Sequence, residues 1–296
     1  MRITNGMLHR QALRHLERLQ ERLYEAQVQI GTGYRLNRPS DDPAALVQAS
    51  RLSEERALRE QYLRNIDFSR GFAEATLGAL DRILGRLSEL GELAVRGANE
   101  TFGPQERAAL AERARSLLAE LLSELNGRHG DLYLFSGTRV HTQPFVYSGG
   151  AYTYQGNTAE LLREVGPNLL MALNLTGDRL QDLGGGQTLT GIVQSFITAL
   201  ETDDLPAIRA SIERLEQAQA HVRVLSAEMG ARLARLEALR ERWMADIEGL
   251  EALRSRLEDA DYAQAASMLE RAQTLYTATA KVISWRLPQS LVDYLR

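Results

Sequence analysis

Apolar residues recur at alternating intervals of three and four positions near both ends of the chain. One series starts at Ala12 and the other at Tyr262. This spacing predicts amphipathic helices whose narrow apolar faces are covered by other helices. We therefore expect the two ends to pack against each other and then against further copies of the chain. The expected interface residues are Leu16, Leu19, Leu23, Ile30, Tyr262, Leu269, Tyr276 and Ile283. For Tyr262 and Tyr276, packing within the chain and contact with a neighbouring copy both stay open.

The first predicted helix covers residues 8–30 and is followed by a break in the helical pattern. We expect the helix to stop at Gly31 and Gly33, because glycine takes the left-handed conformation that ends many helices. Proline disfavours helix at the residue before it and suits the first turn of a new helix. Polar side chains between two prolines can accept hydrogen bonds from free amides. The predicted helix break and cap consists of Pro39, Ser40, Asp41, Asp42 and Pro43.

Four more helices are predicted along the chain. One begins at the break and continues to about Val95, and the next runs from Pro104 to near Gly127, so that the two form an antiparallel hairpin. A short helix near 188–200 and a long one over about 206–258 follow the middle of the chain. In the long helix, Arg232 and Asp246 interrupt an otherwise apolar heptad position. This favours packing in a bundle over a strict two-stranded coiled coil.

The middle of the chain has the texture of β structure. From Asp131 to about Gly186, β-branched and aromatic residues alternate with turn residues. Residues 145–147 and 151–154 flank Ser148-Gly149-Gly150, which predicts a hairpin. The run 169–175 is apolar enough for a buried strand. We expect a small inserted domain, and deletion of about residues 138–180 to spare the helical core.

The sequence therefore predicts a mainly α fold. It is a long antiparallel helical coiled-coil bundle formed by the N- and C-terminal segments, with a small β-rich domain inserted in the middle. The expected terminal helical domain combines 1–44 with 259–296, the bundle domain combines 45–130 with 187–258, and the β-rich domain covers 131–186.

Composition and charge narrow the possible functions. The net charge is only -4 and the basic residues are spread among acidic ones, which disfavours nucleic-acid binding. The chain has no cysteine, so disulfides and thiolate sites are excluded. No apolar run is long enough to span a membrane, and the start of the chain lacks the apolar core of a cleavable signal peptide. We expect neither nucleic acid nor membrane as a partner.

Candidate chemical sites are weak. The five histidines are widely spaced and form no HExxH pattern, so a metal site is not expected. Asp41 and Asp42 are explained by helix capping. Gly184-Gly185-Gly186 lacks the lysine of a phosphate loop and is interpreted as a connector. No nucleophile, base and orienting acid converge, so we expect no enzyme, no catalytic residue and no cofactor.

Several motifs resemble the flagellin superfamily of bacterial flagella, and the resemblance covers essentially the whole chain. It is carried by the segments 1–4, 31–37, 38–44, 97–101, 133–137, 261–263 and 290–295. Within the superfamily, the proline-bracketed pattern at 38–44 is similar to that of the proteins at the junction of hook and filament, whereas flagellins usually lack these two prolines. Residues 287–289 also resemble the flagellin ending, which keeps a filament subunit as the alternative.

The resemblance implies a structural subunit that forms a junction ring between hook and filament and is needed for filament attachment. It also implies export through the flagellar type III apparatus without a cleaved signal peptide, so that the protein becomes extracellular. The implied partners are copies of the chain, the first hook-filament junction protein, flagellin, and an export chaperone on the C-terminal helix. The terminal helical domain would form the polymer core, and the assembly interface would include Leu291, Tyr294 and Leu295.

The physical expectation for the termini is conditional order. Their apolar stripes are narrow, so the surface they bury offsets only part of the conformational entropy lost when the two ends become helical. Contact with neighbouring copies buries further faces. We therefore expect assembly to order the termini.

Overall fold

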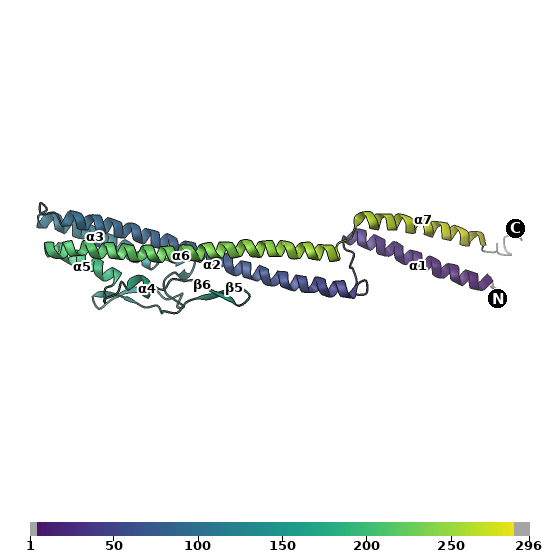
Figure 1. The fold of residues 1–296 in the computed structure, drawn as a ribbon, viewed down its shortest axis with the longest axis horizontal. Helices are drawn as coiled ribbons and strands as arrows, with labels where there is room; N and C mark the ends of the chain where they lie inside the picture. Colours follow the sequence, from purple (N-terminus) through teal and green to yellow (C-terminus); the bar gives the residue numbers. More distant parts are fainter. Residues whose placement is uncertain (1–4, 287–296) are drawn as a thin grey trace. The chain divides into compact units, whose positions relative to one another are not determined.

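The computed structural model describes residues 5–286, which are mainly helical (Figure 1). The helices are α1 (Asn5–Thr32), α2 (Pro43–Gly97), α3 (Pro104–Leu125), α4 (Gly177–Gln181), α5 (Leu189–Glu201), α6 (Leu205–Glu258) and α7 (Tyr262–Arg286). The strands are β1 (Arg128–His129), β2 (Leu132–Tyr133), β3 (Phe145–Ser148), β4 (Ala151–Tyr154), β5 (Leu162–Gly166) and β6 (Leu169–Ala172).

The chain divides into two compact units. Unit 1 combines residues 1–58 with 246–296, and unit 2 covers 59–245. Unit 1 therefore holds α1, α7, the start of α2 and the end of α6, whereas unit 2 holds the remainder of α2 and α6 and all elements between them. The five-segment domain division expected from the sequence stays a prediction.

The predicted fold class is confirmed. The long helices α2 and α6 pack antiparallel, as do α1 and α7, and a small β region lies in the middle of the chain. Local signals located several ends closely, since α3 begins at Pro104 and α6 ends at Glu258. Helix α1 continues through Gly31 to Thr32, and Gly33 then takes a left-handed φ of 77°. The short helix α4 was not predicted.

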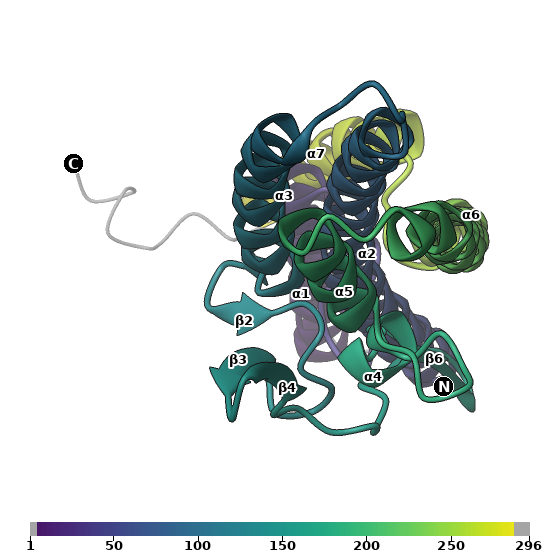
Figure 2. The same cartoon turned by 90° about the vertical axis from the view of Figure 1, so that its left-hand side faces the viewer.

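Four helices build the core of unit 2 (Figure 2). Phe72 of α2, Leu117 of α3, Phe196 of α5 and Leu215 of α6 are fully buried in one apolar cluster. Three ion pairs connect α2 and α3, and residues later in α2 pair with residues earlier in α3. This order confirms the antiparallel hairpin. These pairs are Arg82–Glu124, Arg86–Glu120 and Glu89–Arg113.

The β region consists of three separate two-stranded antiparallel sheets, β1–β2, β3–β4 and β5–β6. The predicted hairpin at Ser148-Gly149-Gly150 is confirmed, because Ser148 pairs with Ala151 and both glycines have positive φ. The run 169–175 is only partly a strand. Strand β6 ends at Ala172, and the residues after it turn toward the helices.

The β region is part of the helical core. Phe145, Leu173, Leu175 and Leu180 belong to the same buried cluster as the helices. A second cluster joins the β5–β6 hairpin to α2 and α6, where the Trp243 indole Nε1 donates to the Val165 carbonyl over 2.8 Å. The expectation that deletion of about 138–180 spares the helical core is therefore wrong, because these side chains cover helical apolar surface.

The Tyr154 hydroxyl holds three β-region segments together. It lies 2.9 Å from the carbonyl oxygens of both Phe135 and Asn157, and the Gly177 N–H donates to it over 3.4 Å. Burial raises the pKa of Tyr154 from 10.0 to about 12. Because the neutral phenol is favoured in the folded state, its contribution to stability is present below the unfolded value and is lost as pH rises from 10.0 towards 12.

Replacing Tyr154 by phenylalanine tests this anchor. Tyr154→Phe removes the hydroxyl that lies against the Phe135 and Asn157 carbonyls in a partly buried site, so the free energy of unfolding falls by about 1 kcal/mol at neutral pH. The variant also loses less stability than wild type between about pH 8 and about pH 11. Urea unfolding followed by circular dichroism measures both. Tyr147→Phe, on an exposed ring of the neighbouring strand, is the matched control and should be neutral; an equal loss in both variants would contradict the anchor.

Candidate assembly site

The terminal helices α1 and α7 pack through the two predicted stripes. Leu19 and Ala26 on α1 and Ala265 and Ala272 on α7 are buried. Further predicted positions on these helices are half-buried, namely Leu16, Leu23, Ile30, Leu269, Tyr276 and Ile283. Tyr262 remains 59% exposed. Leu291, Tyr294 and Leu295 lie outside the described residues, and the assembly role of all these positions stays a prediction.

Helix α7 presents a second apolar line to solvent. Met268, Leu275 and Val282 are spaced by seven residues, and about half of each side chain is exposed. Between residues 262 and 284 the helix has only three charged residues, Glu270, Arg271 and Lys281. Helix α1, in contrast, carries seven charged residues between positions 10 and 25. The outer face of α7 is therefore unusually apolar for a solvent-facing helix.

The break between α1 and α2 is held by its own side chains. The Asp42 Oδ1 accepts a hydrogen bond from the Ala45 N–H over 3.0 Å and caps α2. The Asp41 Oδ2 accepts from the amides of Asn37 and Arg38 over 3.0 and 2.8 Å. Pro39 and Ser40 form the centre of the turn that Asp41 closes, and Pro43 is the first residue of α2. Both carboxylates thus satisfy backbone amides.

A short backbone bridge joins this break to the segment between α6 and α7. Tyr34 pairs with Asp259 in an isolated antiparallel bridge. The Ala260 N–H donates to the Gly33 carbonyl over 2.9 Å. The Asp261 Oδ1 accepts from the amides at the start of α7, over 2.9 and 3.1 Å. We call residues 33–42 together with 257–261 the joint.

A cleft of about 260 Å³ lies beside the joint. The Arg38 guanidinium lies 5.6 Å from the centre of the Tyr24 ring, within cation–π range. The cleft's other lining residues are Glu25, Val28, Gln29, Arg35, Asn37 and Asp41. This lining holds no nucleophile beside a base, so it supports no catalytic chemistry.

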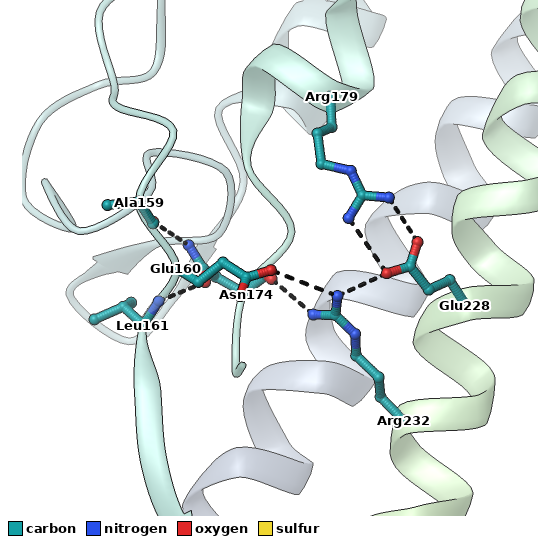
Figure 3. Close-up of polar contacts among 7 residues, drawn as sticks. All are labelled: Ala159, Glu160, Leu161, Asn174, Arg179, Glu228 and Arg232. Carbon is teal, nitrogen blue, oxygen red and sulfur yellow. Dashed lines mark hydrogen bonds and ion pairs between the residues drawn. The ribbon is translucent and has the colours of Figure 1, made fainter. Parts of the chain in front are cut away.

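A second polar cluster fastens the β region to α6 (Figure 3). Glu228 accepts two hydrogen bonds from Arg179 of α4, over 3.2 and 2.7 Å, and one from Arg232 over 2.6 Å. The Arg232 Nη1 donates to the Asn174 carbonyl over 3.1 Å. The hydrogen bonds from Arg179 are the main cause that lowers the pKa of Glu228 from 4.5. We call Arg179, Glu228, Arg232 and Asn174 the latch.

Sequence reasoning missed the role of the latch. The heptad pattern presents Arg232 as an interruption of an apolar seam, whereas its guanidinium donates a hydrogen bond to the Asn174 carbonyl of the β region. A usable signal existed, because Glu228 precedes Arg232 by four residues on the same helix face. Asn174 is a polar residue in an apolar run. Its side-chain oxygen accepts from the Leu161 amide over 2.8 Å, which explains its burial.

Within residues 5–286, no group of three or more histidine, cysteine or acidic side chains is arranged to hold a metal ion. None of the described helices is long and apolar enough to cross a membrane.

Two family matches cover most of the chain. Residues 3–139 match the bacterial flagellin N-terminal helical region, and residues 212–295 match the bacterial flagellin C-terminal helical region. The chain is 26% identical to flagellar hook-associated protein 3 of Escherichia coli, over 96% of each chain. It is 23% identical to a flagellin of Halalkalibacterium halodurans, over 92% of this chain and 91% of the flagellin.

Solved structures share the fold. A flagellar hook-associated protein from Vibrio parahaemolyticus matches with a TM-score of 0.70 and 23% identity, over 74% of this chain and 100% of that one. The flagellar hook-associated protein 3 of Legionella pneumophila matches with a TM-score of 0.65 and 16% identity, over 70% of this chain and 98% of that one.

Replacing Glu228 by glutamine tests the latch. The change removes the anionic partner of two arginines that are partly exposed, so the free energy of unfolding falls by about 1 kcal/mol. The lowered pKa of Glu228 means that its contribution is present above 4.5 and is lost as pH falls through the folded value. The difference in the free energy of unfolding between wild type and Glu228→Gln should therefore become smaller in acid. Glu216→Gln, on an exposed part of α6, is the control, and identical acid profiles for wild type and Glu228→Gln would refute the latch.

Proposed function

The chain belongs to the flagellin family, and we propose that it is the subunit that joins hook and filament in a bacterial flagellum, a hook-associated protein 3. The observation that carries the proposal is its likeness to the Escherichia coli protein of that name over 96% of both chains. The family is structural and non-enzymatic. The proline-bracketed break and the ending Asp293-Tyr294-Leu295 support the same assignment, because both resemble the junction proteins.

We propose that the subunit works in a ring of identical copies at the distal end of the hook. Its further partners would be the first hook-filament junction protein and flagellin, together with an export chaperone on the C-terminal helix. Export would proceed without a cleaved signal peptide. Segments 1–44 and 259–296 would form the polymer core, and the helices and β region between them would form the rest of the subunit.

The burial of unit 1 supports a core that becomes ordered on assembly. Among the α1 and α7 residues whose burial the structure describes, the buried ones are Leu19 and three alanines, while the other large apolar side chains of the seam are only partly buried. The exposed line at Met268, Leu275 and Val282 leaves apolar surface for a neighbour. Covering that line would add the burial that the isolated pair lacks.

A flagellin-type filament subunit is the second candidate. Its support is the match to a flagellin over more than nine tenths of both chains and the ending at residues 287–289. The two candidates differ in where the protein lies along the flagellum.

Electron microscopy of detached flagella labelled with an antibody to this chain separates the candidates. A junction subunit predicts a single band where the hook ends. Label along the whole filament would instead establish the filament subunit, and an antibody to flagellin on the same preparation provides the reference pattern.

Replacing Leu19 by aspartate tests the role of the terminal seam. A carboxylate buried without a partner costs several kcal/mol, so assembly at hook ends should fall by at least about tenfold. The thermal unfolding of unit 2 should not change, because Leu19 belongs to unit 1. Gln20→Asp introduces the same charge at an exposed neighbour and is the control. Normal assembly of Leu19→Asp would exclude the seam from the polymer core.

A further inference from the structure

Arg35 lies in the joint, where α1 and α6 end and α2 and α7 begin. Its backbone N–H donates to the Glu258 carbonyl over 2.6 Å, and its Nη2 donates to the Leu257 carbonyl over 2.7 Å. Both carbonyls belong to the last turn of α6, where backbone acceptors lack partners within the helix. A residue 222 positions away in the sequence therefore closes the C-terminal end of α6.

The second guanidinium nitrogen extends the contact to α2. The Arg35 Nη1 lies 3.7 Å from the Asp42 Oδ2, while the other oxygen of Asp42 caps α2 through the Ala45 amide. The Arg35 and Asp42 side chains are 45% and 38% exposed, so this ion pair is weak as a source of stability. The ion pair instead contributes to the orientation of the joint. A planar guanidinium can contact a carbonyl and a carboxylate at the same time, whereas a lysine side chain has only one nitrogen.

Gly33, two residues before Arg35, joins the end of α1 to the segment before α7. The Gly33 carbonyl accepts from the Ala260 amide over 2.9 Å. Gly33 has a left-handed φ of 77°, which favours glycine, and a Cβ there would lie 2.8 Å from the tip of the Tyr262 side chain at the start of α7. The contacts of Arg35 and Gly33 thus bind the ends of α1, α2, α6 and α7 into one joint.

We propose that Arg35 is a positioning residue for assembly. By closing α6 and reaching the cap of α2, it fixes the direction in which α1 and α7 leave the joint, and this direction presents their apolar faces to a neighbouring copy in one register. The inference rests on the proposed function, because it assumes that the terminal pair is the part that assembles. It adds to that function the residue that sets the geometry of the pair.

The test uses the full-length chain and isolated hook ends. Arg35→Met keeps an unbranched stem and removes every donor, and we expect it to lower the amount bound at hook ends by about tenfold, the effect of losing a hydrogen bond from a charged group. Arg35→Lys should fall between this variant and wild type. Asp42→Asn keeps an effective helix cap and removes the charge, so a reduction of only about twofold is expected.

Arg38→Met is the matched control. It removes the same charge from the same segment, but the Arg38 guanidinium lies over the Tyr24 ring. Its binding to hook ends should match wild type, and the thermal unfolding of unit 2 should be the same in all variants, since positions 35, 38 and 42 belong to unit 1. Normal binding of Arg35→Met, or an equal loss in Arg38→Met, would overturn the positioning role.

A second readout does not depend on hooks. Hydrogen exchange of peptides spanning 33–36 and 257–260 in the unassembled full-length chain should accelerate by about tenfold in Arg35→Met and stay unchanged in Arg38→Met. Unchanged exchange in Arg35→Met would overturn the inference even if the protein binds hooks. If wild type fails to bind hook ends while this exchange difference is present, the proposed function fails and the joint stands.

Discussion

Apolar burial is distributed unevenly along this chain, and that imbalance limits what its two ends can do alone. In unit 2, large side chains such as Phe72, Leu117 and Phe196 are fully buried among four helices and the β region. In the terminal pair, the buried positions among those whose burial is described are Leu19 and three alanines. The larger side chains of these stripes, such as Leu23 and Leu269, are only partly buried, so covering by neighbouring copies would add apolar burial that the pair does not reach alone.

The joint lies within unit 1, between the terminal pair and the ends of α2 and α6. On one side, α2 and α6 lead into a well-filled core; on the other, α1 and α7 form the narrow pair. The joint is not a loose linker, because Asp41, Asp42 and Arg35 satisfy its backbone groups with side-chain hydrogen bonds. If α1 and α7 become ordered only on assembly, a fixed direction at the joint would present their apolar faces to the neighbouring copy as soon as the helices form.

The sequence located the elements better than it located their connections. Prolines, glycines and the apolar period act locally, so the start of α3 at Pro104 and the end of α6 at Glu258 could be predicted closely. The attachment of the β region to the helices could not be predicted from the sequence. Burial of Phe145 among the helices and the pairing of Arg179 with Glu228 depend on residues far apart in the chain, and Arg232 therefore appeared to be a defect in a seam.

Hydrogen exchange of residues 12–30, compared between dilute, unassembled protein and protein bound at hook ends, tests conditional order most directly. Assembly should slow exchange in this stretch by orders of magnitude, while the amides of α3 in the core of unit 2 stay equally protected in both states. Equal, slow exchange of residues 12–30 in the isolated chain would contradict the account, because it would mean that the terminal pair is stable without neighbours.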